Sequence, residues 1–364
     1  MTWRRAGAMR GCVGTIARMQ YSKLGDTGLI VSRLCMGVMT FGVNTVNAAL
    51  GKVDQDGATV MVNAAIEAGI NFFDTANVYS GGQSEEMLGR ALGARRKDVV
   101  IATKLGFRVG PAITDAGLSR HNVIAACEAS LKRLNTDYID LYQAHKEDAL
   151  TPLEETLEAF DRLVRAGKVR YLGFSNWASW RAATALQMQK ERGWARFVSG
   201  QLHYSLLNRE VEHDLAPFLR AGGLGMLVWS PLGGGFLSGK YTRENITKEG
   251  RHAAFDIVPF DREKGFALVD AMRPLAQRAD CTVAQLALAW LLTKPVVTSV
   301  LIGSAKLSQL EDNIGAAAVK LDPAITAKLD ELTAPTAIYP HWFNARLTDA
   351  KIKDGLAAST AGQA

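Results

Sequence analysis

Short apolar runs alternate with longer amphipathic stretches along most of the sequence. Within each run the apolar residues are mostly consecutive rather than alternating with polar ones, which is typical of strands that are covered on both faces. The pattern predicts eight strands, at roughly 33–38, 70–74, 98–103, 138–144, 169–174, 197–202, 225–230 and 298–302.

Helical periodicity fills much of the sequence between these runs. Ser84 and Ser119 stand where N-caps are expected, and the predicted helices are 56–69, 84–92, 119–134, 152–168 and 281–294. Eight strand–helix units in about 300 residues predict an α/β protein with a closed parallel (β/α)8 barrel, a TIM barrel. No G-x-G-x-x-G occurs, so the doubly wound dinucleotide-binding fold lacks its usual fingerprint.

Two segments stand outside this repeat. Residues 21–31 are typical of a β-hairpin, with Gly25, Asp26 and Gly28 supplying the turn. The longest irregular segment, about 233–262, follows the seventh strand and is rich in glycine and charge. A loop of that length in a compact domain is usually functional.

The sequence predicts one domain, because no Pro- or Ser-rich linker divides it. We expect a single barrel over residues 21–345, an N-terminal tail at 1–20 that is disordered or additional to the domain, and a C-terminal tail at 346–364. The N-terminal tail holds four arginines and no acid, and without them the net charge falls from +6 to +2. An organellar transit peptide and a tail before a second start at Met19 both stay open, and we favour the tail.

The composition disfavours several kinds of partner and location. A nucleic-acid partner is not expected, because basic patches with interleaved aromatics are missing from the body. No run of eighteen apolar residues occurs, so no membrane span is expected. Cys12, Cys35, Cys127 and Cys281 form no closely spaced pair, which favours reduced thiols in the cytoplasm. The histidines do not cluster with them, so no metal site is expected.

Residues that hold or move protons stand at the ends of consecutive predicted strands. Asp74, Lys104 and His145 end the second, third and fourth strands, and Tyr79 lies in the loop beyond Asp74. In a parallel barrel the C-terminal strand ends gather at one rim, where reacting groups lie. The later strands end at Ser175, Asn176, Gln201, Trp229, Ser230 and Gly303.

These residue types together suit proton transfer to a carbonyl oxygen. A tyrosine hydroxyl with a pKa of about 10 is a weak acid at neutral pH, and a nearby ammonium favours its phenolate. Lys104, held by Asp74, is expected to do this for Tyr79, while His145 orients the carbonyl. Taken singly, each residue also has a structural interpretation, as a solvated strand end, a core histidine, a helix cap or a surface aromatic. None of them is a reductant, so the chemistry requires a bound hydride donor.

Long motifs carry a family resemblance. They are GINFFDTANVYSGGQSEEMLG, DYIDLYQAH, GFSNW and WSPLGGGFLSGKY. On these motifs, residues 21–332 resemble the aldo-keto reductases, a family of nicotinamide-dependent barrels. WSPLGGGFLSGKY and the later QLEDNIGA are most similar to the potassium-channel β subunits and their soluble bacterial relatives.

The resemblance implies a function and a set of site residues. It implies reversible NADPH-dependent reduction of an aldehyde or ketone to the alcohol, the carbonyl reductase and alcohol dehydrogenase class, with Tyr79 as general acid. Lys104 and Asp74 would tune Tyr79, and His145 would orient the carbonyl. Nicotinamide contacts are implied for Ser175, Asn176, Gln201 and Trp229, pyrophosphate contacts for Ser230, Leu232, Gly234 and Lys240, and adenosine contacts for Gly303, Ser304, Lys306, Gln309, Asp312 and Asn313.

Two positions bear on the choice of cofactor and function. Gln309 stands where many family members carry an arginine that grips the 2′-phosphate, which leaves Lys306 as the nearest cation. We expect NADP(H), with NAD(H) as an alternative. A nucleotide-binding regulatory subunit with incidental turnover stays open beside the enzyme, although His145, which channel subunits often lose, favours the enzyme. A metal-dependent hydrolase is disfavoured because metal-ligand clusters are missing.

Aromatic residues are expected to form the substrate pocket. Met39, Phe41, Trp177 and Tyr204 follow predicted strands. The C-terminal aromatic run that includes Trp342 would close over the mouth or pack as a surface patch. An aromatic-lined cleft suits apolar or ring-bearing carbonyl compounds, but it does not choose among aldehydes, ketones, sugars and polycyclic compounds.

Overall fold

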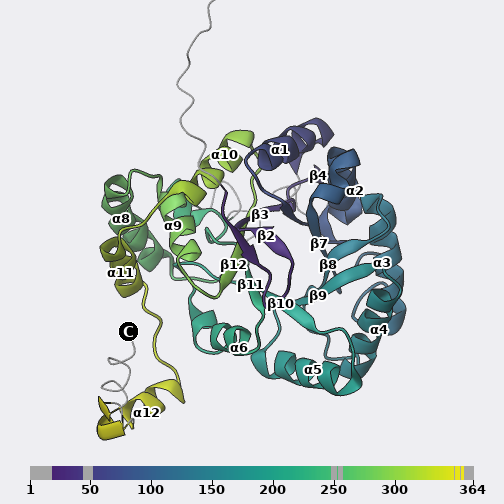
Figure 1. The fold of residues 1–364 in the computed structure, drawn as a ribbon. Coiled ribbons are helices and arrows are strands. Elements are labelled where there is room, and N and C mark those ends of the chain that lie inside the picture. The colour runs from purple at the N-terminus through teal and green to yellow at the C-terminus, as the bar shows by residue number, and fades with distance from the viewer. Residues whose placement is uncertain are drawn as a thin grey trace, which may run out of the picture.

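The computed structural model describes residues 19–43, 52–246, 252, 257–347, 349–352 and 354–355. A closed barrel of parallel strands stands at its centre, with helices around it (Figure 1). Neighbouring strands follow chain order, and the last pairs with the first. The barrel strands are β3(Leu34–Gly37), β6(Phe72–Asp74), β7(Val100–Leu105), β8(Ile139–Ala144), β9(Val169–Ser175), β10(Phe197–His203), β11(Gly225–Trp229) and β12(Val297–Ile302). The predicted (β/α)8 barrel is confirmed.

The consecutive apolar pattern of the strands has a direct structural cause. Every residue of β7 and β8 is buried, because one face of each strand fills the barrel and the other packs under helices. Cys35, Phe72 and Leu141 belong to the inner cluster, whereas Phe73 and Tyr142 belong to the outer one. Burying an apolar side chain of this size contributes about 1.5–3 kcal/mol, so both layers stabilise the barrel.

Helices cover the outside of the barrel. Ser119 caps its helix as predicted, because its side chain accepts a hydrogen bond from the backbone of Asn122. Ser84 is not an N-cap, which corrects the prediction: Gly82 caps that helix, and the buried Ser84 hydroxyl donates to the carbonyl of Val38 at 2.7 Å. The helices are α1(Gln55–Glu67), α2(Gln83–Leu92), α3(Arg120–Leu134), α4(Leu153–Arg165), α5(Ser179–Arg192), α6(Leu215–Ala221), α8(Arg262–Arg278), α9(Val283–Leu292), α10(Leu307–Gly315), α11(Pro323–Leu332) and α12(His341–Arg346).

The predicted N-terminal hairpin is present as β1(Tyr21–Lys23) and β2(Ile30–Ser32). Leu24 and Val31 are fully buried in the inner cluster of the barrel. A Cβ at Gly25 would lie 2.6 Å from the carbonyl oxygen of Gly223 and 2.9 Å from the nitrogen of Gly225, at the start of β11. The hairpin therefore closes the N-terminal end of the barrel, and the opposite end is left for a site.

The remaining elements lie in loops. A small sheet pairs β4(Gly42–Val43) with β5(Lys52–Val53). Short 3-10 helices are η1(Tyr79–Gly82), η2(Gly93–Asp98), η3(Glu210–Glu212), η4(Phe236–Ser238) and η5(Ala316–Ala318). Most of the two tails predicted at 1–20 and 346–364 lies outside the described residues.

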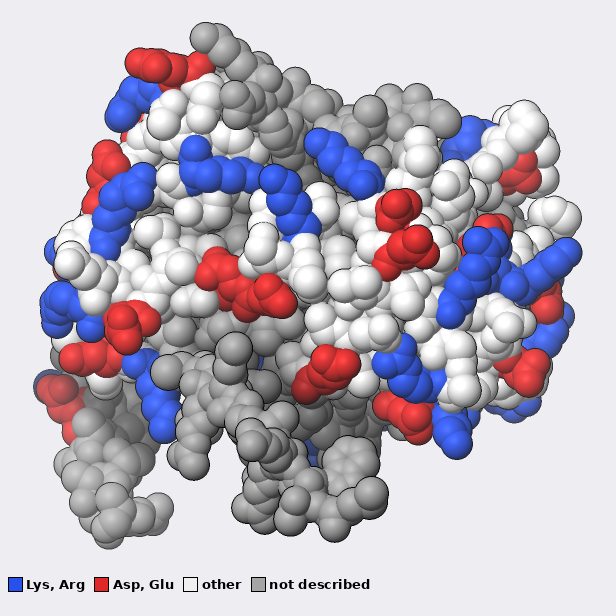
Figure 2. Space-filling model, turned by 90° about the horizontal axis from the view of Figure 1, so that it is seen from above, with Lys and Arg blue, Asp and Glu red and all other residues white. Residues whose placement is uncertain are grey.

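The described surface carries side chains of both charge signs. In Figure 2, Lys and Arg side chains are interspersed with Asp and Glu across the face in view. None of the helices in the described part of the chain has the length and apolar character that a membrane crossing needs.

Candidate active site

The barrel register brings the predicted proton-handling residues together. Asp74 is the last residue of β6, Lys104 lies next to the end of β7, and His145 directly follows β8. Neighbouring strands are parallel and in register, with Asp74 opposite Ala102 and Lys104 opposite Gln143. The side chains therefore meet at the C-terminal end of the barrel.

A buried ion pair forms the base of this cluster. The Lys104 Nζ donates to Asp74 Oδ1 at 2.5 Å, to the carbonyl oxygen of Thr75 at 2.8 Å and to the Tyr79 hydroxyl at 3.4 Å. The side chains of Lys104 and Asp74 are 0% and 2% exposed. An ammonium has three donors, and each of them has a partner here.

The second oxygen of Asp74 is held as well. It accepts from the side-chain nitrogen of Gln201 at 2.7 Å and from that of Gln143 at 3.5 Å. Burial raises the pKa of Asp74, and the attraction of Lys104 opposes that shift. Burial by itself lowers the pKa of Lys104, but the pull of Asp74 and Tyr79 more than offsets it, so the pKa lies above its usual value. Lys104 is therefore a charged ammonium at neutral pH.

His145 lies against the same phenol. Its ring centroid is 5.6 Å from that of Tyr79, with the two planes close to perpendicular. The residue is 9% exposed, and its Nδ1 is buried without a hydrogen-bond partner. Burial and the charge of Lys104 hold the pKa of His145 well below 6.5. The imidazole is therefore neutral and keeps one N–H to donate.

The turn after β6 directs Tyr79 toward Lys104. The Tyr79 nitrogen donates to the carbonyl of Ala76 at 3.1 Å, and the chain then passes through left-handed conformations at Ser80, Gly81 and Gly82. A Cβ at Gly82 would lie 2.7 Å from the side chain of Arg133, so glycine is required where the chain enters α2. Tyr79 is half-buried, with its hydroxyl over the ion pair.

A second cluster of hydrogen-bonded side chains lies at the C-terminal ends of β9, β10 and β11. The Trp229 indole nitrogen donates to Asn176 Oδ1 at 3.0 Å, and the Asn176 amide donates to Ser175 Oγ at 2.9 Å and to the carbonyl of His145 at 3.1 Å. Ser175 Oγ donates to the carbonyl of Gln201 at 2.8 Å. The sequence predicted that Ser175, Asn176, Gln201 and Trp229 lie together, and the structure brings these four residues together.

Two aromatic residues beside these clusters were not predicted. His203 contacts Trp229 in a tilted arrangement with 4.7 Å between ring centroids, and its Nδ1 lies 3.2 Å from the Trp229 carbonyl oxygen. Phe107 approaches His145 edge to face, with centroids 4.7 Å apart. Side chains two residues apart on a strand point to the same face, so the position of His203 could have been predicted from that of Gln201 on β10. Phe107 carried no such signal, because it follows the strand.

The loop after β11 contains the predicted pyrophosphate residues. Ser230 and the glycines 233, 234 and 235 have positive φ, so their backbone curves into a tight coil. The Ser230 hydroxyl accepts from the nitrogen of Gly234 at 3.0 Å. Leu232 is half-buried at the base of this loop, and the Lys240 ammonium lies 3.4 Å from where a Cβ of Gly235 would stand. The backbone N–H groups of residues 233–237 bond within the loop, so the Lys240 ammonium is the group here that suits an anion.

The end of β12 holds most, but not all, of the predicted adenosine residues together. Ser304 is buried and its hydroxyl has no partner, whereas Gly303, Lys306 and Gln309 are exposed around the start of α10. Asn313 is buried within α10.

Asp312 faces another way. Its two oxygens accept from Thr282 and Gln285, at 3.2 and 3.1 Å, at the start of α9. The structure therefore gives Asp312 two partners in the first turn of α9, and its adenosine contact stays a prediction.

The structure does not bring most of the predicted pocket residues to the mouth. Met39 is half-buried, but Phe41 is fully buried in the outer core. Trp177 is 1% exposed and packs on Phe174 and Phe197 between barrel and helices. The side chains of Phe41 and Trp177 point into the layer under the helices, because the loop turns after the strand.

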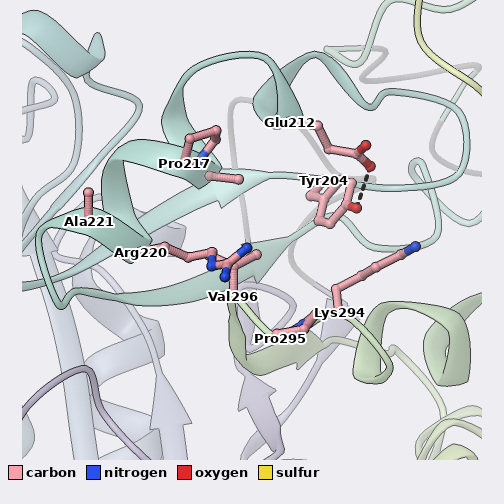
Figure 3. Close-up of a pocket in the computed structure, with 9 residues that line it drawn as sticks. Tyr204, Glu212, Pro217, Arg220, Ala221, Lys294, Pro295 and Val296 are labelled. Carbon is pink, nitrogen blue, oxygen red and sulfur yellow. Dashed lines mark hydrogen bonds between the residues drawn. The ribbon is translucent and has the colours of Figure 1, made fainter. Parts of the chain in front are cut away.

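Tyr204 lies in a different hollow. Its hydroxyl donates to Glu212 at 2.5 Å, and it lines an outer cavity of about 580 Å³ between α6 and the segment before β12 (Figure 3). Trp342 belongs to α12, which has no buried residues and lies outside the ring of helices in Figure 1. Trp342 contacts Tyr339 and Phe343 in its own segment.

The described residues contain no group of three or more His, Cys, Asp or Glu side chains that could hold a metal ion. They do offer features that suit a dinucleotide: the Lys240 ammonium beside the loop after β11, the unpartnered buried hydroxyl of Ser304, and the flat Trp229 ring fixed by Asn176. These lie at the C-terminal ends of β9, β11 and β12, on the rim that also carries Lys104.

Comparison with known proteins agrees with this geometry. The sequence model of the "Aldo/keto reductase family" matches residues 33–334. The chain is 39% identical over 328 residues to a Bacillus subtilis protein named "Uncharacterized oxidoreductase YrpG", covering 86% of this chain and 96% of that one. It is 36% identical over 326 residues to a "Probable voltage-gated potassium channel subunit beta" of Oryza sativa subsp. japonica, with the same coverage. It is 32% identical over 344 residues to "Versiconal hemiacetal acetate reductase" of Aspergillus parasiticus, covering 88% and 99%.

Proposed function

The chain belongs to the aldo/keto reductase family and is an oxidoreductase, and we propose that it reversibly reduces an aldehyde or ketone to the alcohol with NADP(H). The single observation that carries this proposal is the contact chain from Asp74 through Lys104 to the Tyr79 hydroxyl. The cytoplasmic location inferred from the cysteine spacing is part of the same proposal.

Tyr79 gives its hydroxyl proton to the carbonyl oxygen. Loss of that proton leaves a phenolate, which the ammonium of Lys104 at 3.4 Å stabilises. Asp74 keeps Lys104 charged and fixes its direction, because both side chains are buried and bonded to each other. In the reverse direction the phenolate takes the proton back from the alcohol.

His145 orients the carbonyl group. Its imidazole is neutral, so it donates one hydrogen bond without adding a second positive charge beside Lys104. The perpendicular contact of the His145 and Tyr79 rings supports convergence of their polar edges on one oxygen.

The residues that would hold NADP(H) are those at the ends of the later strands. The cofactor supplies hydride from C4 of its nicotinamide ring when bound. Ser175, Asn176 and Trp229 would contact the nicotinamide, with Gln201 joining them to Asp74. Ser230, Leu232, Gly234 and Lys240 would contact the pyrophosphate, and Gly303, Ser304, Lys306, Gln309 and Asn313 the adenosine end.

The test is Tyr79→Phe, which keeps the ring and removes only the hydroxyl. We expect the rate of NADPH oxidation with a reducible aldehyde to fall by about 10²- to 10⁴-fold, the range for losing a general acid. NADPH binding, followed by quenching of tryptophan fluorescence, is expected to be unchanged. A variant that turns over like the parent would remove Tyr79 from the chemistry.

A nucleotide-binding regulatory subunit is the second candidate, and two relatives named as potassium-channel β subunits favour it. The two candidates differ in turnover. Steady-state NADPH oxidation that depends on both the carbonyl compound and Tyr79 supports the enzyme, whereas tight NADPH binding without turnover across a panel of aldehydes and ketones supports the regulatory subunit.

A further inference from the structure

The loop between β7 and α3 presents an apolar face at the C-terminal end of the barrel. Phe107, Val109 and Ile113 are 39%, 47% and 88% exposed. The loop is nevertheless ordered by its own hydrogen bonds: Val109 donates to the carbonyl of Asp115 at 3.0 Å, and the Arg108 guanidinium donates to the carbonyls of Gly110 and Ala112. An ordered loop with exposed apolar side chains is typical of a binding surface.

Phe107 connects this face to the proton-transfer group. Gly106 has a φ of +121°, and a Cβ there would lie 3.3 Å from Leu118, so glycine allows the chain to turn back over the barrel mouth. The turn sets the Phe107 ring edge to face with His145, at 4.7 Å between centroids. Since His145 contacts Tyr79, Phe107 forms a wall directly beside the reacting position.

A cation also lies beside the Phe107 ring. The Lys146 ammonium lies 5.5 Å from the centroid of the Phe107 ring. Lys146 is exposed, and it forms no ion pair with any carboxylate in the described part of the chain.

The other charged side chains nearby have local partners. Arg108 is bonded to loop carbonyls, and Asp115 accepts from the nitrogen of Ala112. Glu147 accepts from the nitrogen of Ala178, while Asp148 accepts from Leu118 and Thr151. Arg108 is held by the carbonyls of its own loop, so Lys146 is the cation that lies against the Phe107 ring and can meet a ligand there.

We propose that the substrate is an aromatic or apolar carbonyl compound that carries a carboxylate, with its body against Phe107 and its carboxylate paired with Lys146. This inference rests on the proposed carbonyl reduction and names its substrate class. The contacts run in the order Tyr79, His145, Phe107 and Lys146. A compound whose carbonyl and carboxylate lie on opposite sides of one ring follows the same order.

The experiment compares two substrates of nearly the same shape, 4-carboxybenzaldehyde and its neutral methyl ester, with the parent and with Lys146→Met. We expect the parent to prefer the acid, and the variant to lose about two- to fivefold in kcat/KM for the acid, mainly through KM, with kcat/KM for the ester unchanged. The preference of the parent is also expected to weaken as salt is added, because salt screens an exposed pair.

Two further variants sharpen the comparison. Lys23→Met makes the same charge change at the hairpin that closes the opposite end of the barrel, and it is expected to leave both substrates unchanged. Lys146→Arg keeps the charge and is expected to restore the preference for the acid.

The outcomes separate the two proposals. Equal kcat/KM for acid and ester in the parent, or equal losses for both in Lys146→Met, would overturn the carboxylate assignment while leaving carbonyl reduction in place. Absence of turnover with both aldehydes and with a wider carbonyl panel would overturn the proposed function, and this inference with it.

Discussion

Replacement of Lys104 by methionine tests the centre of the site most directly. Methionine has a similar length, so the change removes a charge and three hydrogen bonds while leaving little empty space. It leaves the Asp74 carboxylate, 2% exposed, without its cation. Breaking a buried ion pair by removing one partner costs about 3–5 kcal/mol.

The structure favours the lower end of that range. Gln201 and Gln143 still donate to the other oxygen of Asp74. Burial already raises the pKa of this carboxyl, so without Lys104 it can take up a proton and avoid an unpaired buried charge. We therefore expect the free energy of unfolding of Lys104→Met to fall by about 3 kcal/mol at neutral pH.

Activity is expected to fall for a separate reason. Without the ammonium at 3.4 Å, the phenolate of Tyr79 loses its stabilising charge, and we expect carbonyl reduction to slow by about 10²- to 10⁴-fold. The double variant Lys104→Met/Asp74→Asn removes both charges. It is expected to recover most of the lost stability and none of the lost rate.

The assays are urea unfolding followed by far-UV circular dichroism, and initial rates at saturating NADPH. The two readouts separate a structural role of Lys104 from a chemical one, because the double variant is expected to recover stability without recovering the rate. Turnover at the parent rate in Lys104→Met would refute the reasoning. So would a double variant that regains rate together with stability.

Two more predictions follow from the same geometry. The folded-state pKa of His145 lies well below the unfolded value of 6.5, so below that pH the unfolded state binds a proton that the folded state does not, and stability falls as pH falls by up to about 1.4 kcal/mol per pH unit. His145→Gln should flatten this slope in urea unfolding at about pH 5, 6 and 7.5, and an unchanged slope would place its source elsewhere. Lys306→Ala should weaken NADPH by about tenfold and NADH by less than twofold in fluorescence titrations, and equal losses would mean that the 2′-phosphate is recognised elsewhere.

The barrel and the residues at its strand ends could be predicted because both follow from periodicity. Consecutive apolar residues identify a strand that is buried on both faces, and strand order then fixes which ends lie together. Asp74, Lys104 and His145 met as expected because each stands at or within one residue of its strand end. There the backbone direction is still set by the sheet.

The predicted pocket positions differ from the structure for residues in the loops that follow the strands. Trp177 lies two residues after β9 and Tyr204 one residue after β10, and both side chains turn under the helices. Phe107 lies two residues past β7, as far as Trp177 lies past β9, yet the positive φ at Gly106 turns its ring to His145. A pattern with period two cannot distinguish these cases, because loop dihedrals decide them.

Asp312 shows that contacts between two outer helices are also hard to predict from the sequence pattern. Its motif predicted a nucleotide contact, but its side chain accepts from the first turn of α9. Thr282 and Gln285 form a capping box there, which is a local signal in the sequence, but nothing local indicates that a second helix supplies a carboxylate to it. Contacts between helices of the outer ring depend on their packing angles, which the sequence pattern leaves open.

Hydrogen bonds connect the Asp74–Lys104 pair to the cluster around Trp229. The register of the barrel strands therefore determines the positions of both groups. Gln201 donates through its side chain to Asp74 and accepts through its backbone carbonyl from Ser175, which in turn accepts from Asn176. Asn176 holds the Trp229 ring by one hydrogen bond and the carbonyl of His145 by another. A slip of one residue in β10 would therefore displace the Asp74–Lys104 pair and the Trp229 ring together. The relative positions of the Asp74–Lys104 pair and the Trp229 ring are thus fixed by strand pairing in the barrel, whereas Phe107 and Lys146 stand on the loops after β7 and β8, which can change without disturbing that pairing.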